Sequence, residues 1–193
     1  MNDKGALFMK KFLLAFDKGL NKLTTGASLA AGLFILLTAF IILYEIIMRG
    51  IFHSPTEWVL EISTYFIIMA GFLGLAVAFR QGAHVRVDLL ADKLPEGLRR
   101  KVNMTVQVMS FLLFLIFMTE SMDLVTASLT YNKLSPSILR VPLFIPQAAL
   151  VLGSALLLGE IARRFLLELL GIADLQELAA KEETAAAEAK EVC

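Results

Sequence analysis

Cysteine is nearly absent from this chain of 193 residues, whose only one is Cys193. A single thiol leaves no partner for an intrachain disulfide and cannot build a cysteine metal site. The only two histidines, His53 and His84, flank an apolar run at opposite ends. Helix rise places them roughly 30 Å apart, which is too far for both imidazoles to bind one haem iron.

The sequence also lacks the motifs of common catalytic sites. It contains no nucleophile elbow, no zinc-type histidine and glutamate cluster, and no glycine loop that would cradle a phosphate. We therefore expect no enzymatic activity, no metal and no other cofactor. We also expect no nucleic-acid partner.

Charged residues are missing from four long stretches, residues 23–44, 62–79, 102–119 and 141–159. Hydrophobic residues make up 58% of the chain, and its mean hydropathy is +0.73. At about 1.5 Å of rise per residue, each stretch crosses or nearly crosses a hydrocarbon layer roughly 30 Å thick. The sequence therefore predicts an all-α integral membrane protein. Its four transmembrane helices are expected at residues 23–48, 56–80, 98–130 and 142–162.

The residues before the first span, 1–22, predict a basic amphipathic leader helix. Phe8, Phe12, Phe16 and Leu20 recur every fourth residue while lysines gather on another side. This pattern is typical of a helix that lies in the headgroup layer. A flexible basic leader is the alternative. A cleaved signal peptide is disfavoured, because charged residues interrupt the apolar run soon after it begins.

The distribution of Lys and Arg predicts that both termini are cytoplasmic. Basic residues are dense in the leader and between Arg80 and Lys101, and they are sparse in the other two connecting segments. Arg163 and Arg164 then return the C-terminus to the cytoplasmic side. Residues 165–193 form an amphipathic and acidic tail on that side, to which we assign no function.

The start of the second span carries a recognisable capping pattern. In Ser54-Pro55-Thr56-Glu57, Ser54 is placed to cap the helix, Pro55 to take its first position and Glu57 to close a capping box. Trp58 is then expected at the outer membrane interface, where an indole ring is favoured.

Prolines organise the segment between the third and fourth spans. Pro136, Pro142 and Pro146 fall close together there, and each fixes one backbone torsion angle. We expect an ordered outer loop, with Pro146 opening the last helix.

Small residues recur along the second span. Ala70, Gly74 and Ala78 lie four apart, which lets another helix backbone approach closely. Ala149 and Gly153 repeat the motif more weakly in the fourth span. The partner helix is either internal or part of another protein, and both a compact bundle and a spread arrangement of the four helices remain open.

Arg49 and Glu61 suggest a charge pair near the outer ends of the first two spans. A bare charge in hydrocarbon is costly, so each must be hydrated, snorkelled or paired. We hypothesise that Arg49 pairs with Glu61 and pins the first hairpin. Independent solvation at the headgroups is the alternative.

Taken in order, several motifs resemble the small membrane subunit (DctQ type) of tripartite ATP-independent periplasmic (TRAP) transporters. The resemblance covers roughly residues 23–164. Two adjacent acids often follow the tryptophan in this family, whereas Leu60 precedes Glu61 here. The residues that carry the resemblance are Arg49, Trp58-x-x-Glu61, Phe72-Leu73-Gly74, Arg80-x-Gly82-x-His84-x-Arg86-x-Asp88, Arg140-x-Pro142 and Pro146.

The resemblance implies a complex of three proteins in the bacterial inner (cytoplasmic) membrane. A periplasmic substrate-binding protein (DctP type) would capture an organic acid, and a large membrane subunit (DctM type) would carry it with sodium. The present chain would be a non-catalytic subunit that braces the large one, and its outer face is a candidate seat for the binding protein. A membrane anchor for a redox or biosynthetic enzyme is the alternative function. The sequence does not identify the transported substrate.

The segment after the second span is a further candidate site. We propose that Arg80, His84, Arg86 and Asp88 form a hydrogen-bonded corner, because Gly82 permits a sharp turn. A contact between Arg86 and a phospholipid phosphate is one alternative, and plain positive-inside charge is the other.

Overall fold

The architecture of the chain is all-helical. A computed structural model describes residues 3–81 and 96–169, with the side chains of the first helix described from Leu13 onward. Its helices are α1 (Asp3–Gly50), α2 (Trp58–Arg80), α4 (Glu96–Thr130) and α5 (Phe144–Leu169). All four are long and apolar enough to cross a membrane. The expected all-α fold with four membrane helices is therefore confirmed.

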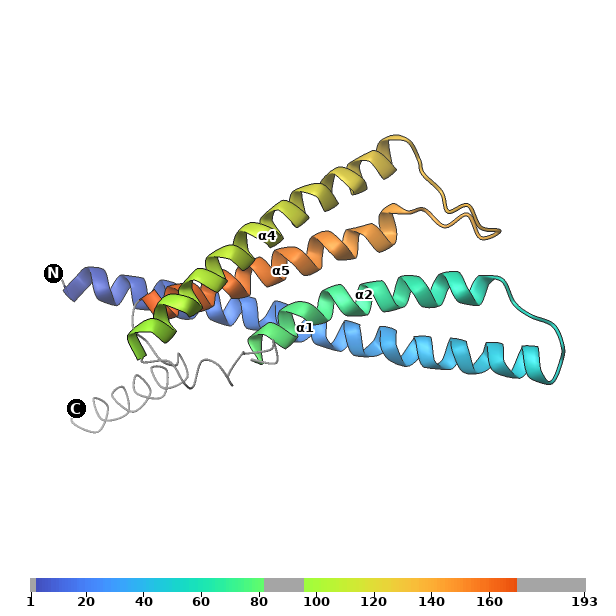
Figure 1. The fold of residues 1–193 in the computed structure, drawn as a ribbon, viewed down its shortest axis with the longest axis horizontal. Coiled ribbons are helices and arrows are strands. Elements are labelled where there is room, and N and C mark those ends of the chain that lie inside the picture. Colours follow the sequence, from blue (N-terminus) through green and yellow to red (C-terminus); the bar gives the residue numbers. More distant parts are fainter. Residues whose placement is uncertain (1–2, 82–95, 170–193) are drawn as a thin grey trace, which may run out of the picture.

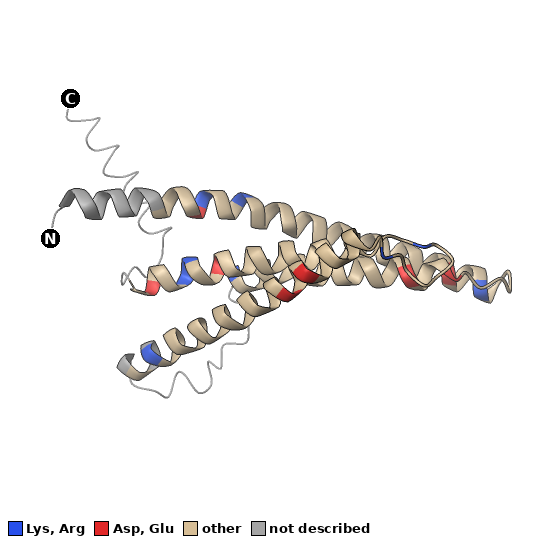
Figure 2. Cartoon of the chain, turned by 90° about the horizontal axis from the view of Figure 1, so that it is seen from above, with Lys and Arg blue, Asp and Glu red and all other residues tan. Residues whose placement is uncertain are grey.

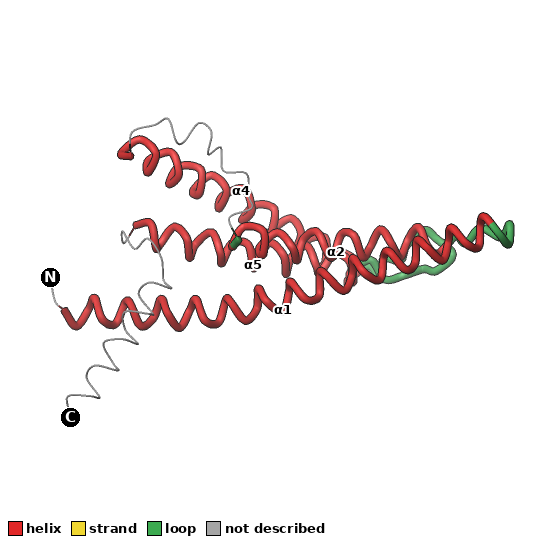
Figure 3. Tube along the Cα trace, turned by 90° about the horizontal axis from the view of Figure 1, so that it is seen from below, coloured by secondary structure: helices red, strands yellow, loops and turns green. Residues whose placement is uncertain are grey.

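The helices form two antiparallel hairpins, α1–α2 and α4–α5, that pack together through α2 and α5 (Figure 1). Helix α5 contacts the other three helices, whereas α4 packs mainly against α5. The edge helices α1 and α4 diverge toward the end of the array at which α2 finishes (Figure 3). The arrangement is therefore a spread one with α5 at its centre, which answers the question that the small residues left open.

Apolar packing is concentrated where α2, α4 and α5 meet. Ala76, Leu157 and Ile161 are fully or almost fully buried there, and Phe111 and Phe114 pack against them. Nearby, the rings of Phe72 and Phe117 stack at 5.4 Å between centroids. This cluster joins the two hairpins, because it contains side chains from both.

Helix α1 runs without interruption through the boundary expected between leader and first span. The hydroxyl oxygens of Thr24 and Thr25 lie 2.9 and 2.8 Å from the carbonyl oxygens one turn earlier, on Leu20 and Asn21. Neither these threonines nor the neighbouring lysines remove a backbone hydrogen bond, so nothing in this segment stops the helix. The position of residues 1–22 at a membrane interface stays a prediction.

The expected capping box at the start of α2 is wrong. The helix begins at Trp58, and Glu57, at the N-cap position, makes no side-chain cap bond. Ser54 is already engaged elsewhere, because its N–H donates to the carbonyl of Met48 at 3.2 Å while His53 has a φ of 51°. The chain after Gly50 thus folds back onto the last turns of α1. Ser54 therefore closes the first helix instead of opening the second.

The loop between α4 and α5, residues 131–143, is ordered as the prolines predicted. Leu134 and Pro142 form an antiparallel bridge, and the N–H of Ser135 donates to the carbonyl of Val141 at 2.9 Å. Pro146 is buried in the first turn of α5, where its missing N–H costs nothing. The two sides of this loop are thereby held together as one small unit.

Candidate functional site

A buried carboxylate lies where three helices meet. Glu160 of α5 has no exposed surface. Its Oε1 accepts hydrogen bonds from Thr24 Oγ1 at 3.0 Å and from Arg80 Nη1 at 2.8 Å, and its Oε2 accepts one from Arg163 Nε at 2.9 Å. A buried charge needs such partners, because it has lost its hydration. Glu160 thus links α1, α2 and α5.

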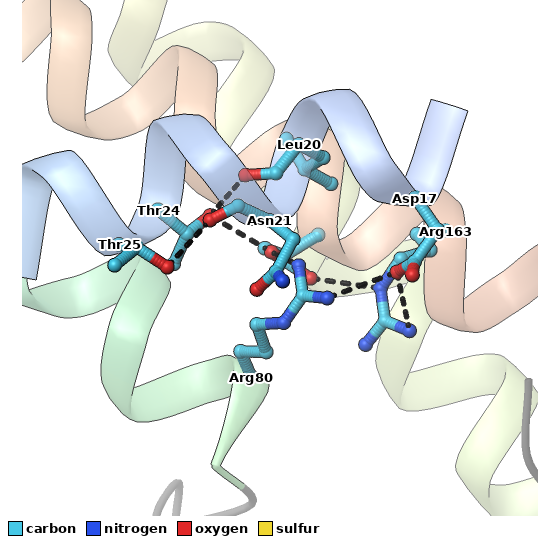
Figure 4. Close-up of polar contacts among 8 residues, drawn as sticks. Asp17, Leu20, Asn21, Thr24, Thr25, Arg80 and Arg163 are labelled. Carbon is cyan, nitrogen blue, oxygen red and sulfur yellow. Dashed lines mark hydrogen bonds and ion pairs between the residues drawn. The ribbon is translucent and has the colours of Figure 1, made fainter. Parts of the chain in front are cut away.

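Asp17 completes this group from α1. Its Oδ1 lies 3.0 Å from Arg80 Nη2 and 3.3 Å from Arg163 Nη1, so each arginine bridges the two acids. Figure 4 shows the guanidinium groups of Arg80 and Arg163 turned toward Asp17 and the helix that carries it. We call these five residues the Glu160 cluster: Asp17, Thr24, Arg80, Glu160 and Arg163. Its two cations and two anions cancel.

The Glu160 cluster gives Arg80 partners that the sequence did not suggest. Its guanidinium group binds Asp17 and Glu160, and the corner expected with three residues of the following segment stays a prediction. The shape of the chain favours the observed contacts of Arg80, because α1 and α5 bring carboxylates to the point where α2 ends. The other members of the expected corner, His84, Arg86 and Asp88, lie outside the described residues.

Glu160 and Asp17 were not predicted as functional residues. A signal was present, since each is an acid at the end of an apolar run that finishes on the same side as Arg80. Four antiparallel spans bring those run ends to one level. Opposite charges at one level of neighbouring membrane helices are expected to pair.

The expected pair between Arg49 and Glu61 does not form. Arg49 Nη2 lies 2.7 Å from Oε1 of Glu45, one turn earlier in α1. The Glu45 carboxylate also accepts bonds from the backbone N–H and the hydroxyl of Thr56. An acid on the same helix face is the nearer partner for Arg49. Glu45 therefore connects Arg49 to Thr56, which lies just before α2.

Glu61 instead connects α2 to the loop of residues 131–143. Its carboxylate accepts a hydrogen bond from the hydroxyl of Tyr65 at 2.8 Å and another from the hydroxyl of Ser137. Trp58, one turn earlier, packs against Tyr44 of α1 with 5.9 Å between ring centroids. The beginning of α2 is thus held on one side by α1 and on the other by the second hairpin.

Helices α2 and α5 approach each other closely at Gly153 of α5. A Cβ built on Gly153 would lie 2.6 Å from the carbonyl carbon of Phe72 in α2. In α2 itself, Ala70 is buried and Ala78 is half-buried, but a Cβ at Gly74 would meet no described atom within 4 Å. The weaker of the expected motifs therefore carries the internal packing. Close packing of another helix at Gly74 stays a prediction.

Two remaining candidates, Arg140 and Pro142, lie in the loop of residues 131–143. Arg140 is exposed and has a φ of 46°, and its N–H donates to the carbonyl of Ser137 at 3.3 Å. Pro142 forms the bridge to Leu134. These residues shape the loop, and Arg140 places its charge on the loop's surface.

Comparisons with known proteins identify relatives. The family model described as "Tripartite ATP-independent periplasmic transporters, DctQ component" matches residues 38–171. The "Sialic acid TRAP transporter permease protein SiaT" of Haemophilus influenzae is 35% identical over 77 residues, which is 40% of this chain and 12% of that protein. The "Isethionate TRAP transporter permease protein DctMQ" of Oleidesulfovibrio alaskensis is 28% identical over 138 residues, 68% of this chain and 21% of that protein.

A third relative is a small permease. The "Ectoine TRAP transporter small permease protein TeaB" of Halomonas elongata is 30% identical over 93 residues, 48% of this chain and 48% of that protein. The chain therefore spans less than half the length of each of the three relatives. The family is one of transport permeases and not of enzymes.

Proposed function

Because the chain belongs to the DctQ-component family of tripartite ATP-independent periplasmic transporters, we propose that it is the small membrane subunit of such a transporter. Its task is to brace a large membrane subunit of DctM type, which carries an organic acid together with sodium. The observation that carries the proposal is the Glu160 cluster, in which the charged groups of three helices satisfy one another. Charges paired in this way hold helices in place and are already satisfied by one another.

The family relationship supports a large membrane subunit as partner. One relative is a permease named DctMQ, and the aligned region accounts for 21% of its length. A protein whose small part is joined to a longer permease keeps the two parts together in one membrane. We infer that the present chain associates with a separate large subunit in the same way, in the bacterial inner membrane with both termini cytoplasmic.

The loop of residues 131–143 supports a second contact, with the periplasmic substrate-binding protein. The loop is ordered by its backbone bonds, and it exposes Tyr131 (74%), Ile138 (79%) and the charged side chain of Arg140. An ordered surface that mixes apolar and charged groups suits protein recognition. The relatives are named for sialic acid, isethionate and ectoine, so they do not single out one substrate.

The proposal is tested by purifying the tagged chain from its native membrane in a mild detergent. We expect a large permease to co-purify in about equal amount, and we expect no visible absorption band from the complex. Isolation of the chain alone, or together with a haem protein or a biosynthetic enzyme, would contradict the proposal. In vesicles, the chain without the large subunit should take up no organic acid.

A further inference from the structure

Two carboxylates of α4 stand apart from every other charge in the helix array. Glu120 and Asp123 are exposed, and within residues 13–81 and 98–169 neither side chain has a hydrogen bond or an ion pair. Helix α4, which carries them, is also the least buried of the four helices. Only 6% of its most apolar stretch is buried against the rest of the chain, compared with 44% for α5. These acids therefore face whatever surrounds the chain.

The level of Glu120 in the membrane follows from the contacts of its neighbours. Phe117 stacks on Phe72 of α2, which lies eight residues before Arg80, or roughly 12 Å along the helix. Glu120 is about one turn beyond Phe117, so it lies well inside the apolar section between Arg80 and Glu61. Figure 2 shows acidic positions part-way along α4.

The two acids belong to a regular exposed stripe. Met109, Leu113, Ile116, Glu120 and Asp123 follow one another at intervals of four, three, four and three residues. The three apolar members are 67%, 65% and 64% exposed. This spacing is that of a seam along which one helix packs against another. We call these five residues the α4 face.

Lipid is a poor neighbour for the α4 face. A carboxylate at this depth is costly when it meets only acyl chains, and the short side chains of Asp and Glu cannot snorkel as far as Lys or Arg. A second copy of the same face would oppose acids with acids. The surroundings that fit are a membrane helix of another protein that presents cations.

We propose that the α4 face is the docking surface for a transmembrane helix of the large membrane subunit. That helix contributes apolar side chains to the stripe and at least one Arg or Lys to Glu120 and Asp123. This inference rests on the proposed function. It adds which helix of the small subunit is used and what chemistry the partner must offer there.

Neutralisation of the two acids should act in opposite directions on the free chain and on the complex. In the variant Glu120→Gln/Asp123→Asn, the isolated chain loses two uncompensated charges, so its thermal midpoint should be unchanged or higher. In the complex, the partner's cation is left without a counter-charge. We expect the dissociation constant of the large subunit in detergent to rise roughly tenfold or more, so that it dissociates at a correspondingly lower dilution. Glu57→Gln, which alters an exposed acid outside the spans, is the matched control and should change neither quantity.

Photo-crosslinking locates the partner directly in the assembled complex. A photoreactive residue at Ile116 should crosslink to the large subunit, whereas one at Leu36 of α1, which is similarly exposed at 54%, should give at least tenfold less of this product. Crosslinks from Ile116 to lipid or to a second copy, while the wild-type pair still co-purifies, would overturn the inference and leave the proposed function standing. Loss of co-purification in the wild-type chain itself would remove the function and this inference with it.

Discussion

At the residue scale, Gly153 determines how closely α2 and α5 approach. A methyl group in place of its hydrogen would meet the backbone carbonyl of Phe72 and lie 2.9 Å from the Cβ of Phe72. Backbone atoms cannot turn aside as the end of a flexible side chain can. The two helices must therefore separate if this residue grows.

We accordingly predict that Gly153→Ala destabilises the isolated chain by about 1–3 kcal/mol, the usual cost of overpacking. Gly74→Ala is the control, because the space around Gly74 is open within this chain and alanine favours a helix. The measurement is the thermal midpoint in a mild detergent, followed by circular dichroism. Equal midpoints for the two variants would show that α2 and α5 do not meet at Gly153.

Individual partners were the part of the structure that the sequence predicted least well. Arg49 was assigned to Glu61, and Ser54 was assigned to the start of α2, yet both have nearer partners in α1. A sequence shows which groups need a partner but not which of several competitors lies at the right distance. Local spacing, such as the single turn between Glu45 and Arg49, proved the better guide.

At the scale of elements, the helices themselves could be predicted with fair accuracy. Each charge-free run became a membrane helix, because its backbone polar groups have no other way to be satisfied in lipid. The continuity of α1 could not be predicted from charge, since lysines beside an apolar run do not end a helix. The small-residue motifs correctly indicated close helix packing. The motif in α2 looked stronger in the sequence, but the close contact is made at Gly153 of α5, because packing depends on the shape of the facing helix.

The loop of residues 131–143 gives the prediction at this scale. The hydroxyl of Ser137 links the loop to α2 by its hydrogen bond to Glu61, and Ser135 makes a further side-chain contact with Glu61. Ser137→Ala removes the hydrogen bond from Ser137, so amide hydrogen exchange within the loop should become about three- to tenfold faster, as expected for the loss of about 0.5–1.5 kcal/mol of net hydrogen-bond free energy. Exchange in α5 should not change.

Ser54→Ala is the matched control for this experiment. Ser54 lies in the other loop, where its backbone N–H and not its hydroxyl group makes the described contact. We expect no change in exchange at either loop. Faster exchange at the start of α2 in this variant would instead restore the capping role that the sequence first suggested.

At the scale of the whole molecule, the Glu160 cluster holds together three helices that are far apart in the sequence. Thr24 and Glu160 are separated by 136 positions. Contacts of this length, together with the central place of α5, could not be predicted from the sequence. The four spans and their antiparallel order follow from run lengths and short connections, but the neighbour of each helix depends on side-chain shape.

Removal of Glu160 should therefore loosen the whole array. Glu160→Ala leaves Arg80 and Arg163 without their buried counter-charge, and we expect a loss of about 3–5 kcal/mol in stability. Asp17→Asn should cost clearly less, because the side chain of Asp17 is 23% exposed and water can take over part of its role. The thermal midpoint and resistance to trypsin in detergent measure both. A larger effect from Asp17→Asn would show that Glu160 is not the centre of the cluster.

The cancellation of charge in the Glu160 cluster has a consequence for a protein that works across an energised membrane. One uncompensated elementary charge that moves through the whole field gains or loses about 2.3 kcal/mol per 100 mV of membrane voltage. Two arginines and two acids bound together carry no net charge through that field, so the voltage exerts almost no force on this part of the chain. Under the function proposed above, this part of the small subunit would stay in place while the same voltage acts on the cations carried by the large subunit.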